Sequence, residues 1–287
     1  MDQDPLVSTD WLAAHLAAPD VRVVDASWHF PQTGRDGRAE YREAHIPGAV
    51  FFDVDDIADT NADLPHMLPS PEKFSSRVRR LGLGDGNRIV VYDTGGVHAA
   101  ARAWWMFRVF GHRDVVVLDG GLPKWRAEGR PIEDIPPIPR ERHFTARIHQ
   151  VMVRDRDQIR DNLASHAEQV VDARGPGRFE GTEPEPRTNV RSGHIPDSLN
   201  VHYADLFNDD ETYKDTDGLR AAFQAAGVDL SRPIVTSCGS GLTACVLALA
   251  LNRLGHQSVA VYDGSWAEWG GLADMPVETG PAALERA

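Results

Sequence analysis

The sequence predicts an α/β protein made of two copies of one domain, each a parallel sheet flanked by helices. Two observations lead to this prediction: the chain repeats its own motifs in order, and each copy alternates short β-rich runs with helical patterns. The chain has 287 residues, enough for two domains of about 100–150 residues each. Its 41% hydrophobic and 25% charged residues are typical of a globular protein.

The repeat consists of four blocks that recur in the same order and at nearly the same separation. They are Val-Val-Asp-Ala at 23–26 and 170–173, His-Ile-Pro at 45–47 and 194–196, an apolar run at 89–93 and 234–238, and Asp-Gly at 119–120 and 263–264. Such an ordered series indicates a duplicated domain, and two copies are too few for a solenoid.

In the first copy, apolar and β-branched runs predict strands at 21–24, 88–92 and 115–118. A helix is expected to begin at Pro71, directly after Ser70, and to end at Gly82. Proline suits the first helical turn, and glycine suits the residue beyond the last turn.

The second copy predicts a helix at 219–226, capped by Asp217 and stopped by Gly227, and an apolar helix at 244–251 that ends near Gly255. Four prolines between residues 130 and 142 exclude regular structure there and indicate a linker. The expected organisation is therefore a domain at 1–130, a Pro-rich linker at 131–150 and a domain at 151–287.

The net charge of the chain disfavours some classes of binding partner. Its 30 Lys and Arg against 43 Asp and Glu give a net charge of −13 at pH 7, which disfavours nucleic acid and anionic membranes. No apolar run is long enough to cross a bilayer, and the acidic start is unlike a secretory signal, so we expect a cytoplasmic protein. The two cysteines form no CxxC pair, so neither a disulfide framework nor a cysteine zinc site is expected.

The two copies differ at the end of the third strand, where the first has Asp93 and the second has Cys238. Cys238 precedes a Gly-rich loop and a helix, so its sulfur is expected at the carboxyl end of a parallel strand, where open α/β sheets bind ligands. Loop amides and the helix start favour the thiolate, and Gly239 and Gly241 let the backbone curl around it. Cys238 is the candidate nucleophile, whereas Cys245, inside the apolar helix, is expected to be a buried structural residue.

Two other classes of cysteine enzyme fit the sequence less well. A cysteine phosphatase needs an arginine about six residues after the cysteine to clamp phosphate, and this position is Ala244. A cysteine hydrolase needs a histidine base; His66, His202 and His256 are present, but their spacing does not single out a triad.

The loop Cys-Gly-Ser-Gly-Leu-Thr at 238–243, together with the repeated His-Ile-Pro and Asp-Gly blocks, resembles the two-domain rhodanese family over nearly the whole chain. Within this family, the Cys-Gly-Ser-Gly sequence is similar to the loop of 3-mercaptopyruvate sulfurtransferases, whereas thiosulfate-preferring members carry basic residues directly after the cysteine. Leu242 departs from the valine that is usual at its position. The resemblance implies tandem rhodanese-like domains, the first inactive and the second catalytic.

The resemblance also implies sulfur transfer through Cys238. Its thiolate would take sulfur from 3-mercaptopyruvate, release pyruvate, and pass the sulfur from a persulfide to cyanide, a thiol or a thioredoxin-type protein. This chemistry requires no metal and no organic cofactor. The loop residues Gly239, Gly241, Leu242 and Thr243 are expected to bind the donor.

An anionic donor requires local positive charge, and Arg178 and Arg187 match the arginines that the family uses for it. From spacing alone, they fit equally well as surface arginines that balance Glu180, Glu183 and Glu185. The resemblance favours substrate binding.

Asp55, His66 and Ser240 are similar to a carboxylate, imidazole and hydroxyl with a proposed role in proton transfer in this family. From the residues alone, Asp55 could cap a helix and His66 could lie on the surface. Residues present in both copies are assigned to the fold instead: Asp25 with Asp172, and His45 with His194.

Two alternative functions stay open. The first is a thiosulfate:cyanide sulfurtransferase, which is disfavoured because neither Gly239 nor Ser240 is basic. The second is a non-catalytic, persulfide-carrying binding module, which is disfavoured by the intact Gly-rich loop after Cys238.

Overall fold

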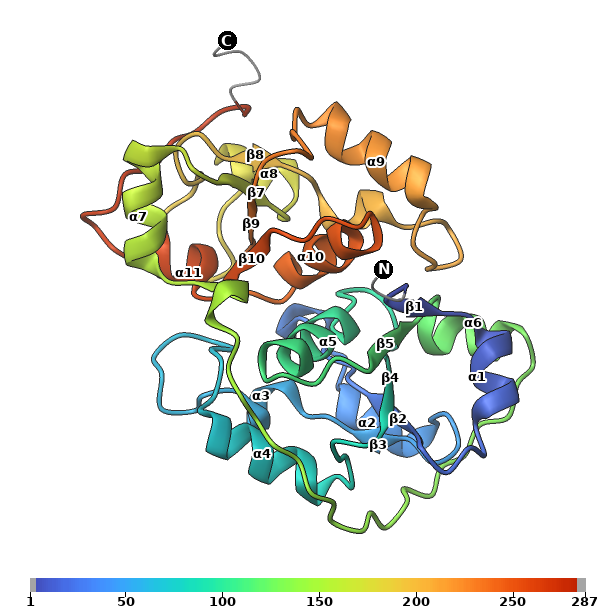
Figure 1. The fold of residues 1–287 in the computed structure, drawn as a ribbon. Helices are drawn as coiled ribbons and strands as arrows, with labels where there is room; N and C mark the ends of the chain where they lie inside the picture. Colours follow the sequence, from blue (N-terminus) through green and yellow to red (C-terminus); the bar gives the residue numbers. More distant parts are fainter. Residues whose placement is uncertain (1–3, 283–287) are drawn as a thin grey trace. The chain divides into compact units, whose positions relative to one another are not determined.

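Two compact units make up the protein (Figure 1). The computed structural model describes residues 4–282. Most of the first copy forms the first unit, and most of the second copy forms the second. Two short segments are exceptions, since Ala62–Met67 belongs to the second unit and Asn208–Tyr213 belongs to the first.

The first unit contains a five-stranded parallel sheet within the described residues. In sheet order, its strands are β1 (Leu6–Val7), β5 (Val115–Leu118), β4 (Arg88–Tyr92), β2 (Val21–Asp25) and β3 (Val50–Phe51). Its helices are α1 (Thr9–His15), α2 (Gly37–Glu43), α3 (Val54–Ile57), α4 (Pro71–Arg80), α5 (Ala100–Val109) and α6 (Gly121–Ala127), with a 3₁₀ turn at Pro31–Thr33. Helix α5 packs against β4 and β5.

The second unit repeats this plan with its own five-stranded parallel sheet in the described part of the chain. In sheet order, its strands are β6 (Val153–Arg154), β10 (Val259–Tyr262), β9 (Ile234–Ser237), β7 (Gln169–Asp172) and β8 (Leu199–Asn200). Its helices are α7 (Arg156–Ser165), α8 (Pro176–Glu180), α9 (Thr216–Ala225), α10 (Ala244–Arg253) and α11 (Ser265–Trp269), with 3₁₀ turns at Gln150–Met152 and Tyr203–Leu206.

The two sheets have the same strand order when each is numbered from its own start, which confirms the predicted fold class. In each sheet, the chain adds strands first on one side and then on the other side of a central pair. This pair is β2 and β4 in one unit and β7 and β9 in the other. Such a reversal leaves a crevice at the carboxyl ends of the central strands, where open α/β sheets bind ligands. The loop after β9 therefore occupies a position suited to a site.

The expected strands of the first copy are present. The structure has β4 at Arg88–Tyr92 and β5 at Val115–Leu118, as predicted, and β2 runs one residue further, to Asp25. Helix α4 begins at Pro71 after Ser70, whose hydroxyl accepts a hydrogen bond from the Lys73 amide at 3.2 Å. The proline and the cap together satisfy the start of this helix.

The predicted cap of the second-copy helix is wrong. Helix α9 begins at Thr216, and its cap is Asp215 rather than Asp217. The Asp215 carboxylate accepts a hydrogen bond from the Gly218 amide at 2.8 Å, whereas Asp217 lies within the first turn. An extended residue before the first turn can reach that amide and a residue inside the turn cannot.

Equivalent tryptophans anchor the two cores. Trp125 and Trp269 are both fully buried, and each belongs to a cluster of buried apolar residues in its unit. Their indole N–H groups donate to backbone carbonyls of prolines a few residues further on, Trp125 to Pro131 and Trp269 to Pro276, both at 2.8 Å. The two units therefore share this buried tryptophan and its hydrogen bond to the backbone as well as their strand order.

The duplicated histidines act in the fold. The backbone N–H groups of His45 and His194 bond to the carbonyls of Glu133 and Glu278, both at 2.8 Å. Their imidazole Nδ1 atoms donate to backbone carbonyls, those of Tyr41 at 2.7 Å and Phe179 at 2.8 Å. Both rings are buried and bonded through Nδ1 to nearby backbone, in agreement with a structural assignment.

Residues 131–149 contain no helix or strand apart from the isolated bridge at Glu133. The end of this segment is nevertheless held in place, because Phe144 is buried against Phe74. The division of the chain at 131–150 stays a prediction. None of the helices within residues 4–282 is long and apolar enough to cross a membrane.

Candidate active site

Cys238 follows directly on β9 and begins the loop that leads to α10. Its side chain is buried, and its backbone is held from both sides. The Cys238 carbonyl accepts from the Trp266 amide at 2.9 Å, and the Cys238 amide donates to the Ser265 hydroxyl at 3.2 Å. The sulfur is thus placed by rigid elements, the end of a central strand and the first turn of α11.

The two glycines of the loop serve different purposes. Gly241 has φ +77°, a left-handed conformation that favours glycine. A Cβ atom at Gly239 would lie 3.1 Å from Nη2 of Arg178 and 3.8 Å from Nη1 of Arg187. Gly241 therefore allows the turn, and Gly239 leaves room for two guanidinium groups beside the loop.

The remaining loop residues close the turn from inside. Leu242 and Thr243 are buried, and their carbonyls accept from the amides of Cys245 and Val246 at 3.0 and 3.1 Å. The Cys245 thiol donates to the Gly241 carbonyl at 3.1 Å. Cys245 is fully buried and supports the loop that carries Cys238.

Arg178 and Arg187 both lie against the Cys238 loop but differ in their partners. Arg178, on α8, donates to both oxygens of Glu185, from Nη2 at 2.6 Å and from Nε at 3.2 Å. Within residues 4–282, the half-buried Arg187 side chain makes no ion pair or hydrogen bond. Burial lowers the pKa of Arg187 from its ordinary value, and the nearby Cys238 sulfur partly opposes this shift. The guanidinium stays cationic at neutral pH, so Arg187 offers charge and donors to a ligand.

Ser240 and His66 meet in the second unit. The Ser240 hydroxyl lies 3.0 Å from Nδ1 of His66, and both side chains are buried. His66 has φ +61°, an uncommon conformation for a residue other than glycine. The interpretation of His66 as a surface residue is therefore wrong.

Asp55 lies in the first unit, where its carboxylate accepts from the Trp28 indole N–H at 2.9 Å. The interpretation of Asp55 as a helix cap is wrong, because Asp53 caps α3. The Asp53 carboxylate accepts from the amides of Asp55 and Asp56, both at 3.1 Å.

The first copy provides an internal comparison for the loop. Asp93 follows β4 as Cys238 follows β9, and its carboxylate accepts from the amides of Gly95 at 2.9 Å and Ala100 at 2.8 Å. An anion at this strand end is thus stabilised by loop and helix amides. In the second copy, the equivalent place after β9 holds the Cys238 side chain.

A family model of the rhodanese-like domain matches residues 8–128 and 155–272. The chain belongs to the rhodanese family. Human 3-mercaptopyruvate sulfurtransferase is 43% identical over 270 residues, covering 92% of this chain and 91% of the human protein. The mitochondrial thiosulfate/3-mercaptopyruvate sulfurtransferase 1 of Arabidopsis thaliana is 42% identical over 301 residues, covering 96% of this chain and 78% of that protein.

Solved rhodanese structures agree with this assignment. The crystal structure of the 3-mercaptopyruvate sulfotransferase SseA from Escherichia coli is similar to this chain with a TM-score of 0.85 and 39% identity, over 92% of this chain and 99% of SseA. The predicted resemblance to the two-domain rhodanese family is confirmed. The protein is a rhodanese-family sulfurtransferase.

Sequence analysis missed a buried ionic network behind the arginines of this rhodanese. Arg174 is buried and donates to Asp172 from Nη2 at 2.7 Å and to Glu185 from Nη1 at 2.8 Å. Glu185 in turn pairs with Arg178, which links the buried network to the loop. A comparison of the two copies could have indicated this network, because the second copy has Arg174 where the first copy has Ser27.

Ser265 was also missed. It has φ +49°, and its first-copy equivalent, Gly121, has φ +53°. Serine occupies this left-handed position while its hydroxyl accepts from the Cys238 amide at 3.2 Å and donates to the Tyr262 carbonyl at 2.7 Å. A serine in place of glycine at a strained position indicates that the hydroxyl has a function there.

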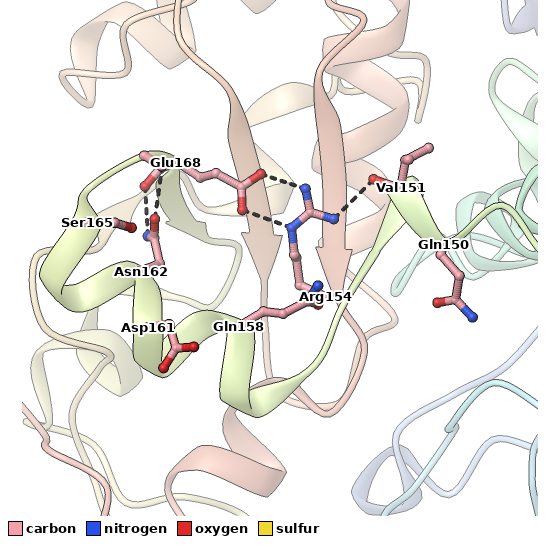
Figure 2. Close-up of a pocket in the computed structure, with 9 residues that line it drawn as sticks. Gln150, Val151, Arg154, Gln158, Asp161, Asn162, Ser165 and Glu168 are labelled. Carbon is pink, nitrogen blue, oxygen red and sulfur yellow. Dashed lines mark hydrogen bonds and ion pairs between the residues drawn. The ribbon is translucent and has the colours of Figure 1, made fainter.

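A separate hollow beside α7 has no connection to this loop. Figure 2 shows its residues, which include Arg154, Asn162 and Glu168. Arg154 pairs with both oxygens of Glu168 at 2.7 and 2.8 Å, and Asn162 bonds to the backbone of Glu168 (Figure 2). These polar groups satisfy one another. Among the described residues, no cluster of three or more His, Cys, Asp or Glu side chains is arranged to hold a metal ion.

Proposed function

We propose that this protein transfers sulfur from 3-mercaptopyruvate through a persulfide on Cys238 to a thiophilic acceptor. The observation that carries the proposal is the approach of two guanidinium groups, from Arg178 and Arg187, to the backbone of Gly239. A buried sulfur next to Arg187, whose side chain has no ion-pair partner within residues 4–282, suits a donor that is small and anionic. The human relative is named a 3-mercaptopyruvate sulfurtransferase, in agreement with this donor.

The first half-reaction begins with the Cys238 thiolate, which attacks the sulfur of 3-mercaptopyruvate. A sulfur–sulfur bond forms and the carbon–sulfur bond breaks, with its electron pair passing to the pyruvate enolate. The proton of the donor thiol ends on the methyl carbon of pyruvate, and the enzyme keeps a deprotonated persulfide. Atoms and charge balance without an external oxidant or reductant.

Each polar group near Cys238 has a place in this step. Arg187 binds the donor carboxylate, and Arg178, fixed by Glu185, faces the keto oxygen on which enolate charge develops. Gly239, Gly241, Leu242 and Thr243 shape the loop around the donor. The persulfide anion takes the position that the Asp93 carboxylate occupies in the first copy.

Ser240 and His66 serve the proton transfer. The Ser240 hydroxyl and the His66 imidazole are in contact at 3.0 Å, close enough to relay a proton from the donor thiol towards the enolate carbon. Asp55 is the carboxylate that the family resemblance adds to this proton-transfer step.

The second half-reaction returns the enzyme to its starting form. An acceptor attacks the outer sulfur of the persulfide, the sulfur–sulfur bond breaks, and its electron pair returns to Cys238. Cyanide leaves as thiocyanate, and a small thiol or a thioredoxin-type protein leaves as its own persulfide. Neither nucleic acid nor a membrane takes part.

Thiosulfate is the second candidate donor, favoured by the name of the Arabidopsis relative, which includes both donors. Its outer sulfur would pass to Cys238 and sulfite would leave, with no proton transfer. The loop has no basic residue at Gly239 or Ser240 to meet the extra charge of this dianion. We therefore rank thiosulfate below 3-mercaptopyruvate.

Mass spectrometry of the protein incubated with 3-mercaptopyruvate and no acceptor tests the proposal. We expect an adduct of one sulfur atom on the peptide that contains Cys238, release of one equivalent of pyruvate, and loss of the adduct after addition of cyanide. The Cys238→Ser variant is expected to fold and to form no adduct. An unmodified Cys238 peptide in the parent protein would support the non-catalytic module instead.

For the compartment, we propose the cytoplasm. The Arabidopsis relative is named mitochondrial, so the alternative compartment is the mitochondrion. Fractionation of the source cells, followed by an activity assay with 3-mercaptopyruvate, tests this placement.

A further inference from the structure

The two arginines beside the Cys238 loop differ in whether a carboxylate balances their charge. Arg178 shares its charge with a carboxylate, since Nη2 lies 2.6 Å from Oε2 of Glu185. The Arg187 side chain has no such partner within the described residues. The positive charge that reaches the loop therefore depends on Glu185 as well as on the arginines.

Glu185 is built into this position. Its side chain is 2% exposed, and its two oxygens are shared between Arg174, at 2.8 Å, and Arg178. Arg174 is itself held by Asp172 at 2.7 Å and by the Gly193 carbonyl at 2.8 Å. A buried carboxylate with both oxygens bonded has one available geometry, so the Glu185 charge cannot move away from the loop.

The charges of this group nearly cancel. Three guanidinium groups, those of Arg174, Arg178 and Arg187, stand against the carboxylates of Asp172 and Glu185. One unit of positive charge remains, and Arg187 carries it beside Cys238. This balance suits a donor with one negative charge, such as 3-mercaptopyruvate, better than the thiosulfate dianion.

We propose that Glu185 is a specificity-determining positioning residue, which fixes Arg178 and limits the positive charge at the Cys238 loop so that singly charged donors are favoured over doubly charged ones. The inference rests on the proposed function for its choice of donors. Donor selection then depends on a buried carboxylate outside the Cys238 loop. Glu185 contacts no reacting atom and acts through Arg178.

Glu185→Gln tests the charge, because glutamine keeps the shape and one carbonyl acceptor but removes the negative charge. We expect the ratio of kcat/KM for thiosulfate to kcat/KM for 3-mercaptopyruvate to rise about tenfold, because one added unit of net positive charge within several ångströms favours the dianion. Glu185→Asp is the matched control: it keeps the charge and loses reach, so both kcat/KM values fall and their ratio stays within about twofold of the parent. An unchanged ratio in Glu185→Gln overturns the proposal.

A pair of variants covers the case in which Glu185→Gln fails to fold with Arg174 left unpaired. The double variant Arg174→Gln, Glu185→Gln removes one charge of each sign, and the single variant Arg174→Gln removes only the positive one. The two variants differ in net charge only through Glu185. We expect the ratio of kcat/KM for thiosulfate to kcat/KM for 3-mercaptopyruvate to be about tenfold higher in the double variant. Equal ratios in the two overturn the proposal.

An alkylation assay separates this proposal from the proposed function. Iodoacetate is an anion and iodoacetamide is neutral, so the ratio of their rates at Cys238, measured by peptide mapping, reports the local charge without any sulfur donor. We expect this ratio to rise several-fold in Glu185→Gln and to stay near the parent value in Glu185→Asp. If the ratio of alkylation rates rises but neither donor transfers sulfur, the proposed function alone is overturned. An unchanged ratio with intact sulfur transfer would overturn the role of Glu185 alone.

Discussion

The imidazole Nδ1 of His66 lies 3.0 Å from the hydroxyl of Ser240, although 174 residues separate the two in the chain. His66 belongs to the segment Ala62–Met67, which the structure places in the unit formed mainly by the second copy. The contact joins a loop of one copy to the cysteine loop of the other. It gives the Ser240 hydroxyl, two residues after Cys238, an imidazole as its hydrogen-bond partner.

His66→Ala is expected to slow turnover of 3-mercaptopyruvate by about 100-fold or more, because the proton of the donor thiol must reach the pyruvate carbon. Thiosulfate requires no such transfer, so its turnover should stay within about threefold of the parent. Steady-state kinetics with both donors checks this, with Ser240→Ala as the companion variant. An equal loss with both donors would mean that the contact only supports the loop.

Ser240→Lys is expected to raise kcat/KM for thiosulfate relative to 3-mercaptopyruvate by about tenfold, since a cation two residues after Cys238 meets the second charge of the dianion. It also removes the hydroxyl that contacts His66, which should lower the 3-mercaptopyruvate value further. Ser240→Met, similar in length and uncharged, separates the two effects. If the methionine and lysine variants share one donor ratio, charge at this position does not select the donor.

Arg187→Ala should reduce kcat/KM for 3-mercaptopyruvate by about 10- to 100-fold, the loss expected for a charge-assisted hydrogen bond to an anion. Because the Arg187 side chain makes no ion pair within residues 4–282, its removal should leave the melting temperature nearly unchanged. Arg187→Lys is expected to recover part of the loss, since it restores the charge without the bidentate fork. Parent-like kinetics in the alanine variant would place this side chain outside the binding site.

Ser265→Gly should keep the fold, because glycine is already present at the equivalent first-copy position, Gly121, with φ +53°. It removes the hydroxyl that accepts from the Cys238 amide at 3.2 Å, so the loop loses one of its anchors. We expect kcat to fall several-fold with the melting temperature within a few degrees of the parent. The alkylation rate of Cys238 by iodoacetamide checks the same change without a sulfur donor, and a parent-like rate would contradict it.

Asp25 gives the first unit a pH-dependent stability. Burial raises the pKa of this carboxyl to about 6, above its unfolded value, while bonds from Ser27 oppose the shift. A raised folded pKa means that its contribution is fully present below the unfolded pKa and is lost as the pH rises through about 6. The free energy of unfolding should therefore fall by about 2–3 kcal/mol from this group between pH 4 and pH 7.

Asp25→Asn should remove this slope while keeping an oxygen that accepts from the Ser27 amide, as Oδ1 does now at 2.9 Å. Urea unfolding at several pH values measures the difference between parent and variant. Asp134→Asn, a change at an exposed carboxylate, is the control and should leave the slope as it is. A variant with the parent slope would show that Asp25 is not the group responsible.

The chain alone was sufficient to predict the duplication, the parallel sheets and the place of Cys238, because these depend on local patterns. Strands β4 and β5 are buried runs of β-branched residues, and the Gly-rich loop after Cys238 is contiguous. Two-residue strands such as β1 and β3 could not be predicted, since they are too short for a period to show. The cap at Asp215 was missed because several acidic residues precede α9 and only backbone geometry selects one.

The rest of the candidate site depends on which distant segments meet. Spacing could not separate a surface arginine from one beside Cys238. The burial of Glu185 beside Arg178 gives Arg178 an ion pair that Arg187 lacks within the described residues. The contact between His66 and Ser240 depends on a loop that joins the other copy's unit. Local patterns decide where a strand ends and a helix begins, whereas the charge and proton partners of a buried sulfur depend on residues that only long-range packing brings together.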